Sequence, residues 1–206
     1  MVFEDGEFVA KEPLSGFEDY MFAQPLGLLP MHLSLHSEVA TLPITFKGKG
    51  VKECFFKINY WGMAKETVDK VRVLADFGFD SADLVTVNDV EIMPRDFMMA
   101  MMADFVPSSM DFLTAPSNEP GDWAKEIVSE VKGVEDGRPI VYRMAMLTIT
   151  GALPTGVLPA RGAVWQASGH VSAGVYPPEL AFDPQPFLKE LEEREIMTRI
   201  TVTRGL

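Results

Sequence analysis

The sequence has little of three features that often reveal a function: cysteine, basic side chains and long apolar runs. Cys54 is the only cysteine among 206 residues, so neither an internal disulfide nor a cysteine-cluster metal site can form. Lys and Arg total 18 against 30 Asp and Glu, which argues against nucleic acid or an anionic membrane as the main partner. The longest dense apolar stretch, residues 97–103, is far too short to cross a bilayer, and residues 1–10 lack the pattern of a signal peptide. We therefore expect a cytoplasmic protein.

A glycine-rich phosphate-binding turn is absent as well. No G-x-G-x-x-G motif occurs, and Gly48-Lys49-Gly50 supplies only its first two glycines before a predicted strand. Walker-type and H-E-x-x-H patterns are also missing. We expect no cofactor bound to this chain, and the sequence leaves any cofactor-binding residues unknown.

What is present is the composition of an ordinary globular protein, with 47% hydrophobic and 23% charged residues. The length suits one domain, or one domain with a small subdomain. Local patterns predict a hairpin at Asp5-Gly6, a helix over 38–42 capped by Ser37 and ended by Pro43, a strand over 51–61, a helix over 64–77, a strand pair over 84–92, a helix from Pro94, a hairpin joining 127–134 to 138–148, and helices over 155–168 and 184–194 before a strand over 197–203. Strands and helices mix without regular alternation, which indicates the α+β class.

Two segments indicate burial or association. The predicted strand over 138–148 is apolar on both faces, so it needs cover on both sides. Residues 144–178 contain Arg161 as their only fixed charge, so we expect them to be buried in the core or in an interface. A homodimer formed through a sheet face would satisfy both expectations. The stretch 107–121, rich in Pro and Ser, is predicted to be a loop that could act as a lid.

The polar cluster with the most catalytic potential lies within residues 32–38. His36 and Glu38 carry the groups needed for proton transfer at an amine carbon, and a helix start at Ser37 can hold a substrate carboxylate. The alternative is structural: Ser37 caps the helix and His36 is a satisfied histidine. Metal binding by His32 and His36 lacks a visible third ligand, so no metal is expected.

Two arginines lie in otherwise apolar segments. Arg143 and Arg161 can each grip a carboxylate through the planar fork of the guanidinium, or each can pair with an acid of this chain. For Arg143 the two interpretations are equally supported. For Arg161 we favour a structural or interface role.

The residues His36 to Pro43, HSEVATLP, resemble a hallmark of the saccharopine dehydrogenase and lysine 6-dehydrogenase family. Further segments resembling the family occur in order along the chain: PLG at 25–27, GVK at 50–52, FK at 56–57, TG at 150–151, GVYPPE at 174–179 and FLKEL at 187–191. The resemblance covers nearly the whole chain. The eight-residue stretch is fairly specific, and the other segments gain weight together.

The resemblance implies that residues 1–206 form a single substrate-binding and dimerisation domain. Its fold would be α+β with a mixed sheet and helices on one face, like the C-terminal domains of saccharopine dehydrogenase and glyceraldehyde-phosphate dehydrogenase. The Rossmann domain that binds NAD or NADP would lie outside this chain. The complete enzyme would oxidise the amine carbon of an amino acid or amino-acid conjugate, such as lysine or saccharopine.

The resemblance also implies roles for individual residues. His36 and Glu38 would be catalytic, while Ser37, Arg143 and Thr150 would contact a small substrate of the amino-acid type. The rival interpretation is a non-catalytic assembly or small-ligand-sensing module that retains the fold.

We predict that this chain binds neither NAD nor NADP appreciably, because it has no turn that cradles a pyrophosphate. Isothermal titration calorimetry should show no heat of binding, while a dehydrogenase with its Rossmann domain binds under the same conditions. Dinucleotide binding at low micromolar concentration would contradict the prediction.

Overall fold

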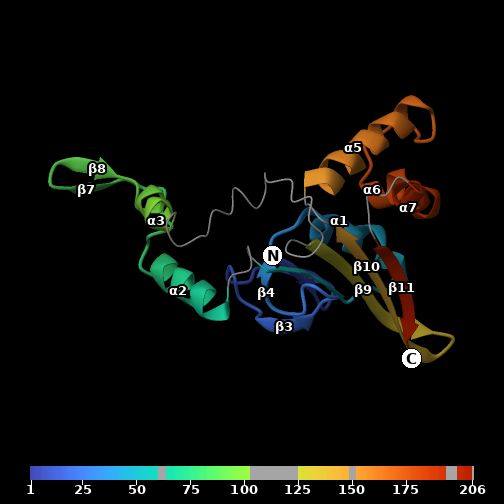
Figure 1. Ribbon diagram of the computed structural model, residues 1–206, viewed down its shortest axis with the longest axis horizontal. Helices are drawn as coiled ribbons and strands as arrows, with labels where there is room; N and C mark the ends of the chain where they lie inside the picture. The colour runs from blue at the N-terminus through green and yellow to red at the C-terminus, as the bar shows by residue number, and fades with distance from the viewer. Residues whose placement is uncertain (60–63, 103–124, 149–151, 194–198, 206) are drawn as a thin grey trace. The chain divides into compact units, whose positions relative to one another are not determined.

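The computed structural model describes residues 1–59, 64–102, 125–148, 152–193 and 199–205 (Figure 1). The chain divides into two compact units. Unit 1 comprises Met1–Met21 and Leu28–Phe112, and unit 2 comprises Phe22–Gly27 and Leu113–Leu206. Helices and antiparallel sheets occur together, which confirms the α+β class. The predicted loop over 107–121 lies outside the described residues.

The elements of unit 1 are β1 (Val2–Glu4), β2 (Glu7–Val9), β3 (Glu18–Met21), β4 (Leu28–Ser34), α1 (Ser37–Thr45), the 3-10 helix η1 (Lys47–Lys49), β5 (Glu53–Cys54), β6 (Phe56–Ile58), α2 (Lys65–Asp76), β7 (Val85–Val87), β8 (Val90–Ile92) and α3 (Pro94–Met102). Those of unit 2 are β9 (Lys125–Glu135), β10 (Arg138–Thr148), α5 (Ala152–Ala167), α6 (Pro178–Ala181), α7 (Pro184–Glu193) and β11 (Arg199–Gly205). In the described part of the chain every strand pairing is antiparallel, so the mixed sheet implied by the resemblance is not found there.

The tight turns follow directly from residue type. Two-residue loops at Asp5-Gly6, Asn88-Asp89 and Asp136-Gly137 join β1 to β2, β7 to β8 and β9 to β10. Every residue in these loops has positive φ, the backbone region that Gly, Asn and Asp adopt most readily. All three hairpins were predicted correctly.

The predicted continuous strand over 51–61 is wrong. Its described part, residues 51–59, instead forms two short strands that join different sheets: β5 pairs with β1, and β6 pairs with β4. Residues 60 and 61 lie outside the described residues. The break falls at Phe55, whose side chain is exposed. Alternating apolar residues indicate which side chains share a face, but they do not indicate which neighbouring strand is the partner.

The predicted start and end of the first helix are also wrong. α1 begins at Ser37 with His36 as its N-cap, and no side chain caps it, so Ser37 is not the cap. The helix continues through Pro43 to Thr45. Pro43 lacks the N–H that would bond to the carbonyl of Val39, one turn earlier. Both residues are buried, and their packing compensates for the missing hydrogen bond.

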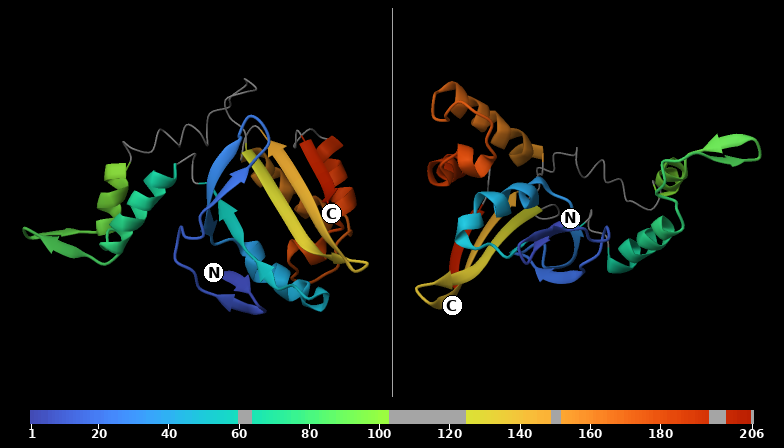
Figure 2. Two further views of the ribbon diagram at one scale, coloured as in Figure 1. Left: turned by 90° about the horizontal axis from the view of Figure 1, so that it is seen from below. Right: turned by 180° about the vertical axis from the view of Figure 1, so that it is seen from behind.

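In unit 2 the sheet has the order β11-β10-β9, and helices lie against it. Leu191 of α7 is completely buried and packs against Met146 of β10 and against Val157 and Leu158 of α5. α5 and α7 lie side by side, as both views of Figure 2 show. α7 starts as predicted, with the Asp183 carboxylate accepting a hydrogen bond from the Gln185 N–H at 3.1 Å.

The expected burial of residues 144–178 is only partly observed. Ala145 and Thr148 of β10 are buried, but Val164 and Tyr176 are about half exposed and Val175 is fully exposed. The expectation that the chain itself buries this stretch is therefore wrong for its second half. The second half of this stretch therefore has few charges and yet forms an exposed apolar surface. Burial of that surface in an interface stays a prediction.

Because Leu191 is the centre of the unit 2 core, we predict that Leu191→Ala lowers the free energy of unfolding by about 2–5 kcal/mol. Leu180→Ala is the matched control, since Leu180 is 59% exposed in α6 and its loss should cost under about 1 kcal/mol. Urea denaturation followed by far-UV circular dichroism measures both values. Equal costs would show that Leu191 is not the packing centre.

Candidate functional site

The strand pairing of unit 1 places an aromatic ring beside the predicted catalytic histidine. In the β4–β6 register Ser34 lies opposite Phe56. His36, two residues further along, stacks its ring on Phe56 with centroids 4.2 Å apart and planes inclined by 24°. This contact fixes the plane of the imidazole and leaves less rotation to be lost when a ligand binds.

His36 and Glu38 form a hydrogen-bonded pair. The Nδ1 atom of His36 shares a hydrogen bond with Oε2 of Glu38, and the Ser37 hydroxyl donates to the same oxygen at 3.2 Å. The side chains of His36 and Glu38 are 44% and 55% exposed. With Nδ1 engaged by the carboxylate, Nε2 is the ring nitrogen that can exchange a proton with a ligand.

Glu38 is held in its ionised form. Partial burial acts to raise the pKa of its carboxyl group, but hydrogen bonds from His36, from the backbone and from Ser37 together lower that pKa below its ordinary value. A carboxylate that stays ionised can orient the imidazole and stabilise an imidazolium. Its own capacity as a proton donor is correspondingly small.

Cys54, unlike the His36–Glu38 pair, is not activated for chemistry. Burial, together with the negative charge of Glu38, raises the pKa of the Cys54 thiol. The thiolate is the reactive form of cysteine, so a raised pKa makes this residue a poor nucleophile. Cys54 therefore acts as a small, partly buried neighbour of the pair.

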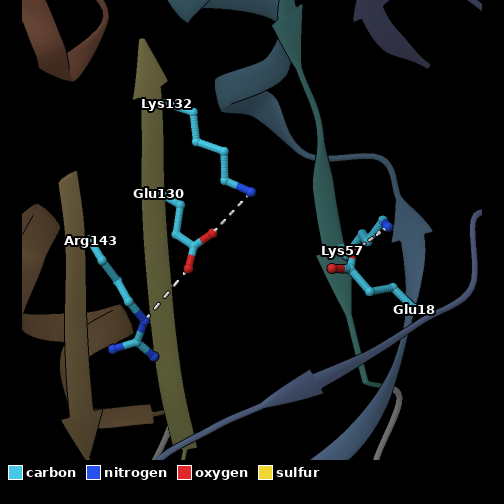
Figure 3. Close-up of polar contacts among 5 residues, drawn as sticks. All are labelled: Glu18, Lys57, Glu130, Lys132 and Arg143. Carbon is cyan, nitrogen blue, oxygen red and sulfur yellow. Dashed lines mark hydrogen bonds and ion pairs between the residues drawn. The ribbon is translucent and has the colours of Figure 1, made fainter. Parts of the chain in front are cut away.

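Arg143 lies among acids of its own unit. Its guanidinium is 3.7 Å from Oε1 of Glu126 and 3.6 Å from Oε1 of Glu130. Figure 3 shows the contact with Glu130, which also faces Lys132. The Glu126 side chain is 2% exposed and accepts the Ala23 N–H at 2.8 Å. A buried carboxylate needs such partners, which gives Arg143 a structural task on this sheet.

A second ion pair holds the strands around the candidate site in register. Lys57 of β6 bonds to Glu18 of β3 at 2.6 Å, across β4, which lies between them (Figure 3). Lys57 immediately follows Phe56 and points its ammonium over the ring of Phe55 at 5.3 Å. The pair stabilises the same register that positions Phe56 beside His36.

The remaining predicted residues are placed as follows. Arg161 pairs with Glu190 of α7, which also accepts the Trp165 indole N–H at 3.3 Å, so Arg161 has the structural role that we favoured. Thr150 lies outside the described residues. The sequence reading missed Phe56 as a site residue because only the β4–β6 pairing brings it to His36.

The chain does not fit a dinucleotide in the residues that the structure describes. Gly48 and Gly50 belong to η1 and its left-handed C-cap, and the strand β5 follows rather than a helix whose N–H groups could hold phosphate. Within the same residues no three His, Cys, Asp or Glu side chains gather to hold a metal ion. None of the helices described is long and apolar enough to pass through a bilayer.

Comparison of the sequence with protein-family models gives no match, and comparison with curated proteins gives none. The family assignment therefore stays a prediction that depends on the motifs of the chain.

His32 is placed very differently from His36. It lies in β4 with 2% of its surface exposed, and neither ring nitrogen has a hydrogen-bond partner among the described residues. Its ring lies 5.7 Å from that of Phe17. Burial lowers the pKa of His32, opposed by the charge of Asp69 and aided by the charges of Lys65, Arg72 and Lys57, and the net shift is downward from 6.5.

This shift predicts acid sensitivity. Because the folded state disfavours the protonated ring, the stability gained by burying neutral His32 is complete well above pH 6.5 and declines as the pH falls through 6.5 towards the lower folded-state pKa. His32→Phe should flatten this part of the stability profile, measured as urea midpoints at about pH 7.5 and about pH 5.5. His170→Phe, at an exposed histidine, is the control that should keep the wild-type slope. An unchanged slope in His32→Phe would contradict the assignment.

Proposed function

We propose that this chain is the substrate-binding and dimerisation domain of an NAD(P)-dependent oxidoreductase that acts on the amine carbon of an amino acid or amino-acid conjugate, in the manner of lysine or saccharopine dehydrogenases. The observation that carries the proposal is the His36–Glu38 pair, stacked on Phe56 at the start of α1. It is the proton-transfer group expected from the HSEVATLP stretch. The dinucleotide would be held by another part of the enzyme, since the sequence has no G-x-G-x-x-G motif.

The proposed chemistry assigns one task to each member of the pair. Oxidation of an amine carbon to an imine requires a group that accepts the proton of the substrate ammonium. His36 would take that proton on Nε2, while Glu38 holds Nδ1 and stabilises the positive ring. Phe56 would keep the ring plane fixed while the proton moves.

The substrate carboxylate has a place near the same residues. Backbone N–H groups in the first turn of α1 would receive the anion, although the N–H of Glu38 already donates to its own carboxylate. The Ser37 hydroxyl, which donates to the same carboxylate, lies beside them. The roles of Arg143 and Thr150 stay predictions from the sequence, and Arg143 already lies near Glu126 and Glu130. The proposed enzyme is a homodimer of the cytoplasm, where a lone cysteine stays reduced.

The exposure of the His36–Glu38 pair supports a second candidate function. His36 and Glu38 are about half exposed, whereas proton-transfer groups work best where water is excluded. A module that senses a small ligand, or that only assembles, would keep the fold without using the pair for chemistry. Kinetics of site variants separate the two candidates.

In the full-length enzyme, His36→Phe should keep the stacking on Phe56 but lower kcat about 10²–10⁴-fold, because a positioned base contributes about that factor. Glu38→Gln should lower kcat by a smaller factor, since the amide still occupies the position of the carboxylate but carries no charge. Steady-state formation of NADH or NADPH with lysine or saccharopine as substrate measures both effects.

Glu53→Gln is the matched control, because it removes an exposed carboxylate from the adjacent strand β5. Its kcat and KM should equal those of the wild type, and melting temperatures should be recorded for all variants. Normal turnover by His36→Phe and Glu38→Gln would sink the catalytic assignment and favour the non-catalytic module. A rise in KM alone would make the pair a binding group instead.

A further inference from the structure

The hairpin β7–β8 has an apolar face that stays exposed among the residues that the structure describes. In the register of this hairpin (Figure 1), Val85 lies opposite Ile92 and Val87 lies opposite Val90. Because alternate residues of a strand point to the same side, these four branched side chains share one face. Val85, Val87 and Val90 are 48%, 50% and 58% exposed. A two-stranded hairpin is marginally stable in water unless one face packs on another element. We therefore expect another protein surface to cover this face.

The surroundings of this face are strongly acidic. Residues 79–94 contain Asp80, Asp83, Asp89 and Glu91 and no Lys or Arg. All four acids are exposed, and none has an ion-pair partner within the described part of the chain. Glu91 pairs with Thr86 on the opposite face of the hairpin, so a partner on the apolar face would meet Asp80, Asp83 and Asp89, and we expect it to carry both apolar and basic side chains.

The same unit carries a surface with that description. Residues 39–52 contain Lys47, Lys49 and Lys52 and no acid. All three lysines are exposed and lack ion pairs among the described residues. They lie between two exposed apolar side chains, Ile44 at 66% and Phe55 at 52%. In a chain of net charge −12, this is the one dense group of lysines in the sequence.

We propose that the acidic hairpin β7–β8 of one copy of this chain docks on the lysine turn, residues 44–55, of a second copy. Two such contacts related by a two-fold axis would close a dimer, with each copy giving its hairpin and receiving the other. The apolar faces supply contact area, and the opposite charges select the partner and the orientation. The contact does not depend on the dehydrogenase proposal, and it uses a surface different from the sheet of unit 2.

Charge reversal tests the contact in the 206-residue chain. One variant carries Asp80→Lys, Asp83→Lys and Asp89→Lys, and the other carries Lys47→Glu, Lys49→Glu and Lys52→Glu. Each variant alone sets like charges against each other in both contacts. An equimolar mixture allows a heterodimer in which both contacts pair opposite charges. Sedimentation velocity at tens of micromolar measures association, and circular dichroism checks that each variant is folded.

The wild type should sediment as a dimer, each variant should show a dimer Kd raised roughly tenfold or more, and the mixture should recover the dimer. Raising the salt concentration should weaken the wild-type dimer. A monomeric wild type would overturn the proposal. So would a dimer that neither reversal weakens, which would indicate the sheet face instead. Folded variants that remain monomers when mixed would overturn it as well, since matched charges would then fail to restore the contact.

Discussion

The antiparallel register of β4 on β6 is the contact on which the candidate site depends. It sets Phe56 beside the end of β4, where the ring of His36 stacks on it. A slip of one residue would turn Phe56 to the other face of the sheet and remove the platform. The ion pair between Lys57 and Glu18 spans the same three strands and opposes such a slip. The first turn of α1 then brings the Glu38 carboxylate to the imidazole of His36.

Paired charges explain how an acidic chain keeps arginines in its apolar segments. Arg143 lies near Glu126 and Glu130 on the sheet of unit 2, and Arg161 joins Glu190 between α5 and α7. A buried carboxylate without a partner is costly, and breaking such a pair costs more than the pair contributes. The main role of these arginines is structural. The His36–Glu38 pair, which is exposed to a ligand, is the better candidate for catalysis.

The sequence by itself determined the parts of the structure that depend on near neighbours. Asp5-Gly6, Asn88-Asp89 and Asp136-Gly137 specify tight turns because their residue types tolerate positive φ. The helical period and Gly78 placed α2 to within a residue or two. The contact between His36 and Glu38 is also local, since the extended backbone of the N-cap residue lets its side chain meet that of the second helical residue. The α+β class follows from the mixture of these local signals.

Tertiary structure alone decided everything that required a partner distant in sequence. It divided residues 53–58 between two sheets, because β1 and β4 pair with neighbouring parts of one extended segment. It carried α1 through Pro43, because burial of Val39 and Pro43 outweighs one lost hydrogen bond. It gave Arg143 its acidic neighbours and brought Phe56 to His36. Local preferences amount to a few tenths of a kcal/mol to about 1 kcal/mol per residue, whereas burial of an apolar side chain contributes about 1.5–3 kcal/mol. Where the two conflict, packing determines the fold.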